Sequence, residues 1–322
     1  MPLQPKRRTR STTTSKLPHE SESGRSLRRW LESDFGSSGF ASHGAIVVDQ
    51  APRTGTRGTI AASRTIFSGD EALAVPRCAW LESAKGSTCE LVERLDFELS
   101  RLPYSSHKAY LEFLPKLESH PVCLPHDMLT HSLSDTSALR TVEHFRASVD
   151  SSERALEYLA LVLSRAFRFA NGSLALVPWA DALNHHSSAA ISSEAELEEE
   201  RANVAALSAA YDVHIGDELC DSYGGAAGKS TLFAQFGFVD PAAPDETVLH
   251  IDDREIHVSV DANKTLPQFD PPLQHMSKDS AAQQAEKLLS RLESGTSETE
   301  SYFKAVRVSE ARAARLALMH LK

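Results

Sequence analysis

The chain has 322 residues, of which 41% are apolar and 24% are charged, an ordinary mixture for a globular protein. No apolar run approaches the roughly 18 residues that a membrane-spanning helix needs, so the sequence predicts no membrane segment. The net charge is −10, but residues 1–30 carry eight Lys or Arg against two Glu, which leaves −16 on the remainder. An acidic body argues against nucleic acid as the main partner, because phosphate binding needs a basic surface.

Residues 1–30 are rich in Arg, Ser and Thr and poor in apolar side chains, so we expect a disordered basic tail. The basic run 5–10 is compatible with a nuclear address, with an organelle transit peptide or with a plain flexible tail, and the compartment stays open. The four cysteines are scattered without a CxxC pair, which argues against a disulfide framework or a cysteine-built zinc site and favours a reducing compartment.

Three kinds of pattern follow one another along the chain. Residues 44–81 predict short strands, residues 86–170 have the apolar spacing of helices, and residues 171–260 predict short strands again. The expected strands cover 45–48, 59–62, 72–75, 174–177, 204–208, 218–221, 248–251 and 255–260. From residue 277 the pattern is helical, with one helix capped by Ser280 and Gln283 and stopped by Gly295, and another started by Ser297 and Glu300. We therefore expect one β-rich domain whose two halves meet around a helical insertion.

Polar residues follow directly on the apolar strand at 174–177, in the order Asp181, Asn184, His185 and His186. Metal binding by the two histidines is one interpretation, but neighbouring side chains on a strand point to opposite faces and no nearby Cys or carboxylate completes a ligand set. Capping of a turn by Asp181 and Asn184 is the purely structural alternative.

A second polar stretch, residues 216–231, contains Gly228-Lys229-Ser230 ahead of a predicted helix at 232–236. A Walker A loop needs a glycine five positions before Gly228, where Tyr223 stands instead. No alternation of strands and helices surrounds the stretch, so a nucleotide triphosphatase is a weak alternative.

Taken together, these stretches resemble the SET-domain protein methyltransferases, in particular the branch that includes the Rubisco large-subunit lysine methyltransferase. Six pieces that resemble the motifs of that branch occur in order. They are Arg57-Gly58 with Ile66–Pro76, Tyr110–Pro115, Ser164-Arg165-Ala166-Phe167, Pro178 with Asp181 and Asn184-His185, Gly216-Asp217-Glu218 with Ser222-Tyr223-Gly224, and Gly237-Phe238-Val239, where Phe236 replaces a tyrosine. The resemblance covers residues 44–250.

The resemblance implies an α+β fold, in which a β-rich SET domain with a pseudo-knot spans residues 31–250 and is interrupted by a helical insertion at about 86–170. Residues 251–322 would then form a short strand and a helical tail of two helices.

The resemblance also implies roles for single residues. Tyr223 would be the catalytic tyrosine, and Asp181, Phe236 and Phe238 would bind the substrate. The expected cofactor-binding residues are Arg57, Gly58, Thr59, Arg165, Asn184 and His185, the last through its backbone. A guanidinium such as that of Arg165 suits the carboxylate of S-adenosyl-L-methionine.

The sequence thus predicts a protein-lysine N-methyltransferase that uses S-adenosyl-L-methionine and no metal. A SET-derived protein-binding module without turnover and a protein-histidine methyltransferase remain alternatives. The expected partner is a protein substrate, with no nucleic acid and no membrane, and we expect a monomer.

Overall fold

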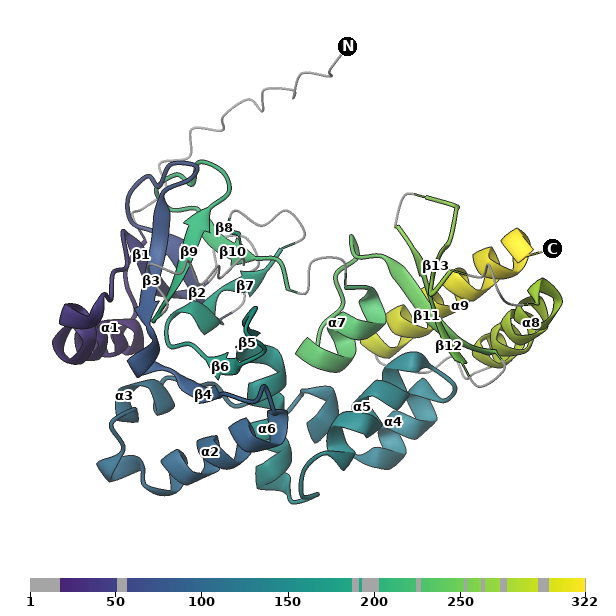
Figure 1. The fold of residues 1–322 in the computed structure, drawn as a ribbon, viewed down its shortest axis with the longest axis horizontal. Helices are drawn as coiled ribbons and strands as arrows, with labels where there is room; N and C mark the ends of the chain where they lie inside the picture. Colours follow the sequence, from purple (N-terminus) through teal and green to yellow (C-terminus); the bar gives the residue numbers. More distant parts are fainter. Residues whose placement is uncertain are drawn as a thin grey trace, which may run out of the picture.

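The computed structural model describes residues 18–50, 57–186, 191–192, 203–223, 227–251, 254–261, 264–272, 277–294 and 301–321. Strands from both halves of the chain gather in one part of the molecule, and the helices of the insertion lie beside them (Figure 1). A second group of strands and helices, built from the C-terminal part of the chain, lies at the other end. Among the described helices, none is long and apolar enough to cross a membrane.

The first helix, α1 (Glu22–Phe35), corrects the expectation that residues 1–30 are disordered. Ser21 begins the helix, because its hydroxyl accepts a hydrogen bond from the N–H of Gly24. Leu27 and Leu31, four residues apart, are fully buried on one face of the helix. The arginines that gave the segment its basic character occupy the other positions of an amphipathic helix, while residues 1–17 lie outside the described part.

One sheet joins strands from distant parts of the sequence, in the order β1-β2-β10-β7. These strands are β1 (Ala45–Gln50), β2 (Arg57–Ala62), β10 (Glu218–Asp221) and β7 (Asn184–His185). β10 pairs antiparallel with β2, where Leu219 faces Ile60, and parallel with β7, where Cys220 faces Asn184. The expected meeting of the two halves is confirmed, since β10 lies between an early and a later strand.

Two further sheets also pair early with late strands. β3 (Glu71–Pro76) pairs with β9 (Val204–Ala209), which pairs with β8 (Ile191–Ser192), and β6 (Leu174–Leu176) lies between β4 (Leu81–Ser83) and β5 (Ala166–Arg168). The intervening helices are α2 (Thr88–Ser100), α3 (Lys108–Leu111), α4 (His126–Leu133), α5 (Ser137–Ala147) and α6 (Glu153–Arg165). Their apolar faces join the strands in one large buried cluster.

The C-terminal part begins with α7 (Lys229–Phe236) and continues with the meander β11 (Asp245–Ile251), β12 (Arg254–Val260) and β13 (Gln268–Asp270). Helices α8 (Lys278–Ser294) and α9 (Ser301–Leu321) pack against it around a second buried cluster. Both predicted helices are present, but α8 begins earlier than expected, because Ser277 rather than Ser280 accepts the capping hydrogen bond. The predicted signals at Gly295, Ser297 and Glu300 lie outside the described residues.

α9 is anchored to the insertion by a fully buried carboxylate. Glu310 accepts hydrogen bonds from the backbone N–H groups of Ser137 and Ala138, at the start of α5. The hydroxyls of Ser230 and Thr247 donate to the same carboxylate. The side chain of Glu310 therefore links α9 to α5, α7 and β11.

Candidate active site

Tyr223 and the segment Leu183–His185 meet where β10 and β7 end side by side. The phenol hydroxyl of Tyr223 donates a hydrogen bond to the main-chain carbonyl of Leu183, and its backbone N–H donates to Nδ1 of His185 at 3.1 Å. Parallel pairing of β7 with β10 produces this arrangement, because Asp221 lies opposite His185. The residues on which the sequence prediction depended are therefore neighbours in space.

Tyr223 lies between two cavities, of about 310 and 250 Å³. The first cavity is also lined by Asn184, His185 and Phe238, and the second by Phe167, Asp221 and Gln235. Six residues line both: Ser164, Arg165, Asp181, Leu183, Tyr223 and Phe236. The two cavities thus share a wall that contains the aromatic side chains of Tyr223 and Phe236, and Tyr223 contributes a hydroxyl group to it.

The aromatic surface is built by the end of α7. The ring centroid of Phe236 lies 4.7 Å from that of Tyr223, and Phe238 lies 6.1 Å from Tyr223 on another side. Gly237 ends the helix with φ +79°, a conformation that favours glycine, and this turn separates the two phenylalanines. Phe236 consequently lines both cavities, whereas Phe238 lines only the first, together with Asn184 and His185.

Arg165 and Asp181 form the charged part of the shared wall. Nη1 of Arg165 donates to the main-chain carbonyl of Asp181 at 2.7 Å and lies 3.7 Å from its carboxylate. Oδ2 of Asp181 also accepts a hydrogen bond from the hydroxyl of Tyr110 at 2.7 Å. Nε of Arg165 and Oδ1 of Asp181 are buried and have no partner among the described residues. One donor and one acceptor are therefore available in the wall to a bound molecule.

Burial controls the protonation of these groups. It raises the pKa of Asp181, an effect that the nearby Arg165 opposes. Burial likewise raises the pKa of Tyr223 well above its usual range, so its phenol keeps its proton at neutral pH. The hydroxyl is consequently a donor to Leu183, and the lone pairs of its oxygen stay available to accept a hydrogen bond.

Glu218 is a site residue that the sequence analysis quoted in a motif but gave no role. Its buried carboxylate accepts hydrogen bonds from the hydroxyl of Thr59 at 2.9 Å and from the amide of Asn184 at 2.8 Å. These contacts fix Asn184 at the cavity wall, but Thr59 is fully buried and is not among the residues that line either cavity. Arg57 and Gly58 begin β2, and the side chain of Arg57 lies outside the described part of the structure.

Asp240 is a second residue that sequence reasoning missed, because it follows the last recognisable motif. Its Oδ2 lies 3.1 Å from Nε2 of His185, and the imidazole is thereby engaged on both nitrogens. His185 is thus a structural partner of Tyr223, which removes the basis for a metal site made with His186. The described residues contain no group of three or more His, Cys, Asp or Glu side chains placed to hold a metal ion.

The phosphate-loop alternative is not supported by the contacts of its two signature residues. Lys229 lies 2.7 Å from the carboxylate of Asp245, and the hydroxyl of Ser230 donates to the buried Glu310. Both side chains therefore stabilise the junction of α7 with the C-terminal part and are not directed toward a phosphate.

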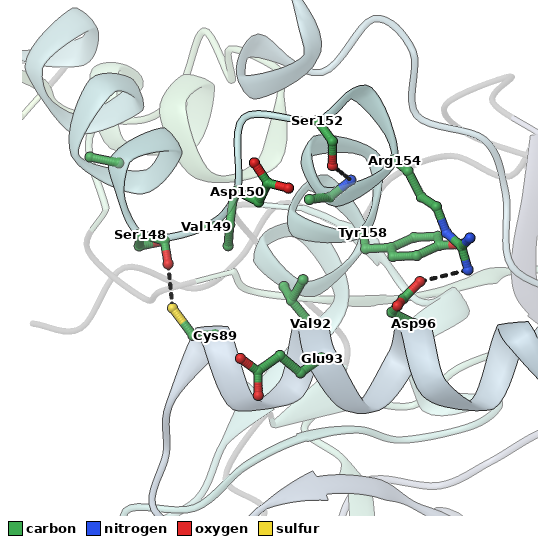
Figure 2. Close-up of a pocket in the computed structure, with 12 residues that line it drawn as sticks. Cys89, Val92, Glu93, Asp96, Ser148, Val149, Asp150, Ser152, Arg154 and Tyr158 are labelled. Atoms are coloured by element: carbon green, nitrogen blue, oxygen red, sulfur yellow. Dashed lines mark hydrogen bonds and ion pairs between the residues drawn. The ribbon is translucent and has the colours of Figure 1, made fainter.

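A larger cavity, of about 440 Å³, lies between α2 and the start of α6 (Figure 2). Cys89, Glu93 and Asp96 project into it from α2, and Arg154 from α6 pairs with Asp96 at 2.6 Å. None of the residues of the Tyr223 wall lines this cavity. Seven of the residues that the sequence singled out line the paired cavities at Tyr223, which makes these cavities the candidate active site. They are Arg165, Asp181, Asn184, His185, Tyr223, Phe236 and Phe238, whereas Arg57, Gly58 and Thr59 are not among the described residues that line either cavity.

No family model matches the sequence, and no curated protein matches it. The structure, in contrast, has the fold of a SET domain, the α+β arrangement that the sequence predicted. Within that class it is similar to Rubisco LSMT. The SET domain of LSMT bound to lysine and AdoHcy superposes with a TM-score of 0.69 at 16% identity, over 93% of this chain and 90% of that one.

Two further structures agree. Rubisco LSMT bound to AdoMet matches with a TM-score of 0.66 at 15% identity, over 94% of this chain and 91% of that one. Rubisco LSMT bound to sinefungin and monomethyllysine gives 0.67 at 16% identity, over 94% and 92%. At such identities the likeness is one of fold, and the chemistry has to be argued from the residues of this chain.

Proposed function

We propose that this protein is an S-adenosyl-L-methionine-dependent protein-lysine N-methyltransferase. The observation that carries the proposal is the position of Tyr223 in a wall shared by two cavities. A group-transfer enzyme needs two adjoining sites of this kind, one for the donor and one for the acceptor. Two of the similar structures contain AdoMet or AdoHcy and a third contains sinefungin, and lysine or monomethyllysine is also present in two of the three.

The first cavity suits the cofactor. Its volume of about 310 Å³ lies within the usual range of ligand pockets, and it combines the aromatic faces of Tyr223 and Phe238 with the amide of Asn184. The buried, unpartnered Nε of Arg165 would donate to a carboxylate of the ligand. S-adenosyl-L-methionine, when bound, supplies an electrophilic methyl group on a sulfonium. Arg57, Gly58 and Thr59 remain predicted cofactor residues, and Thr59 would act through Glu218 rather than by lining the cavity.

The second cavity suits the side chain that receives the methyl group. An unperturbed lysine has a pKa near 10.4, so about 1 in 2,500 molecules is neutral at pH 7 and deprotonation costs about 4.6 kcal/mol. Removing the amine from water disfavours its charged form, and the faces of Phe167 and Phe236 provide such an environment. Asp181 lies in the wall between the cavities, where its free Oδ1 would accept a hydrogen bond.

Tyr223 would orient the neutral amine. Because its own proton is held by the carbonyl of Leu183, the phenol oxygen would accept an N–H of the amine. The nitrogen lone pair would then be directed away from Tyr223, toward the first cavity. Holding donor and acceptor in this geometry supplies much of the acceleration in a displacement reaction.

The test is incubation of the purified protein with methyl-labelled S-adenosyl-L-methionine and a cell extract. Transfer of label to a polypeptide, followed by mass spectrometry of the residue that gains about 14 Da for each methyl, identifies the substrate and the acceptor. Label on histidine instead of lysine would support the protein-histidine alternative. Cofactor binding without transfer to any polypeptide would weaken the enzyme proposal.

The binding-module alternative makes a different prediction. A SET-derived module without turnover would neither transfer label nor bind S-adenosyl-L-methionine measurably in calorimetry, yet would still retain a protein partner. We also propose that the enzyme is a monomer acting on a protein substrate, which analytical ultracentrifugation of the purified chain would test.

A further inference from the structure

Asp240 lies outside the motifs of the proposed function, yet both of its carboxylate oxygens are used. Oδ1 accepts a hydrogen bond from the backbone N–H of Ala242 at 2.8 Å, and Oδ2 lies 3.1 Å from Nε2 of His185. The side chains of Asp240 and His185 are only 16% and 9% exposed. The carboxylate is therefore fixed by its own loop and presents one oxygen to the imidazole.

The contacts of His185 define its tautomer. Nδ1 accepts a hydrogen bond from the backbone N–H of Tyr223 at 3.1 Å, so it carries no proton. The proton of the neutral ring is then on Nε2, where it is donated to Asp240. The titratable groups that face the ring are Asp240, His186 and the phenol of Tyr223. Burial lowers the pKa of His185, which keeps the ring neutral, although Asp240 opposes this effect.

The hydrogen bond to Tyr223 replaces a sheet contact. β10 ends at Asp221, and the last ladder contact there is the N–H of His186 donating to the carbonyl of Asp221. Two residues further, the N–H of Tyr223 is bound by a side chain instead of a neighbouring strand. The imidazole ring also packs against the rings of both Tyr223 and Phe238, with ring centroids 5.4 and 5.3 Å away. The placement of Tyr223 thus depends on the placement of His185.

We propose that Asp240 is a positioning residue, which selects the Nε2–H tautomer of His185 so that the imidazole holds the backbone of Tyr223 and, with it, the phenol at Leu183. The inference rests on the proposed function for its catalytic consequence. Both contacts of residue 240 need a hydrogen-bond acceptor, and a carboxylate provides two acceptor oxygens. An asparagine provides one acceptor oxygen and one donor NH₂ group. That donor would face either the N–H of Ala242 or Nε2 of His185, and the second arrangement forces the proton onto Nδ1, against the N–H of Tyr223.

The first test determines the tautomer of His185 directly. ¹⁵N NMR of histidine-labelled protein distinguishes the two neutral tautomers, and His185→Gln identifies the signal of His185 by its absence. We expect the Nε2–H form at neutral pH in the wild-type protein and a shift toward the Nδ1–H form in Asp240→Asn. A wild-type ring that is protonated on Nδ1 would overturn the proposal.

The second test follows Tyr223 itself, in protein that carries ¹³C at the Cζ of its tyrosines. We expect the phenol of Tyr223 to titrate at lower pH in Asp240→Asn than in the wild type, because it leaves its buried place at Leu183. Glu93→Gln, a matched change of an exposed carboxylate in the other cavity, should leave the titration unchanged. An unchanged titration in Asp240→Asn would contradict the proposal, even in protein without transferase activity.

The third test is kinetic. In Asp240→Asn we expect turnover to fall about 10- to 100-fold, because a small displacement of the reacting groups is costly. The Kd for S-adenosyl-L-methionine should change by a smaller factor than turnover, since residue 240 itself is not among those that line the cavity. Unchanged turnover in the variant would refute the positioning role. Absence of turnover in the wild-type protein would instead count against the proposed function, while the two spectroscopic tests would still decide the role of Asp240.

Discussion

The hydroxyl of Tyr223 donates its hydrogen bond to the carbonyl of Leu183, the residue directly before Asn184. Tyr223, just after the end of β10, is thereby joined to the residue before β7, which lies 40 positions earlier in the sequence. We expect Tyr223→Phe to lower methyl transfer by about 100-fold or more, because the amine loses the acceptor that orients it. Cofactor affinity should change little, and Tyr211→Phe, at an exposed tyrosine, serves as the control. Unaltered transfer by Tyr223→Phe would remove Tyr223 from the mechanism.

Glu218 predicts a joint effect on stability and cofactor binding. Thr59→Val deletes a buried hydrogen bond to the carboxylate of Glu218, and we expect a loss of about 1 to 2 kcal/mol in the free energy of unfolding. Because the same carboxylate holds Asn184, affinity for S-adenosyl-L-methionine should also fall. Urea unfolding and calorimetry measure the two effects, with Thr231→Val at an exposed position as the control. Equal stability of the Thr59 variant and the wild type would show that the contact is dispensable.

The pair of Tyr110 and Asp181 links the helical insertion to the site. Tyr110→Phe removes the hydroxyl that donates to the buried carboxylate, so we expect destabilisation by about 1 to 3 kcal/mol. The pKa of Asp181 should rise further, because the hydrogen bond from Tyr110 favours its charged form. Chemical denaturation together with ¹³C NMR of the aspartate carboxyl tests both expectations. Tyr104→Phe, at an exposed tyrosine, should change neither.

His120 predicts a dependence of stability on pH. Burial lowers the pKa of His120 to about 4, and its ring donates to the carbonyl of Gln235, next to Phe236. In the unfolded chain, His120 takes up a proton near pH 6.5, whereas in the folded protein it does so only near pH 4. Stability from this group is therefore fully present above pH 6.5 and is lost as pH falls toward 4, by up to about 3 kcal/mol.

The measurement for His120 is urea unfolding at a series of pH values. His120→Gln should reduce the loss of stability between pH 6.5 and 4, whereas His131→Gln, at an exposed histidine, should not. A pH profile of His120→Gln that parallels the wild type would show that another group is responsible.

The carboxylate of Glu310 tests how α9 is held. Glu310→Gln converts one acceptor oxygen into a donor that faces the donors Ser137, Ser230 and Thr247. We expect a loss of about 2 to 4 kcal/mol in the free energy of unfolding. Limited proteolysis should then cut the C-terminal part first, while Glu255→Gln, at an exposed position, should behave as the wild type. Uniform digestion of the Glu310 variant would argue against a specific anchoring role.

The sequence predicted the longer strands well, because apolar runs such as 72–75 and 204–208 are bounded by clear turn signals. It also predicted that the two halves of the β-rich domain meet around a helical insertion. It missed the short strands β4, β5, β7, β8 and β13, of which β5 lies inside the segment 86–170 that was predicted to be helical. The register of β10 between β2 and β7 could not be read from the sequence, since it depends on contacts between residues 159 positions apart, such as Thr59 and Glu218. Local patterns carry no information about such a pairing.

Single contacts also escaped the sequence analysis. Residues 22–30 were assigned to a disordered tail because their many charges masked the spacing of Leu27 and Leu31, which only burial against the strands reveals. Nothing in the sequence indicated a role for Asp240. A carboxylate after a glycine-phenylalanine turn is an ordinary surface feature, and only the structure shows that it contacts His185. The predicted roles of Phe236 and Phe238 were not separable in sequence, although in the structure Phe236 lines both cavities and Phe238 lines only the first.

The late strand in the middle of the sheet has a consequence for biosynthesis. While a ribosome makes the chain, β2 and β7 emerge without β10, the strand that lies between them in the finished sheet. Contacts so distant in sequence form slowly. A nascent chain halted before residue 218 lacks Tyr223 and Phe236, which line both cavities, so the candidate active site is completed only when most of the polypeptide already exists.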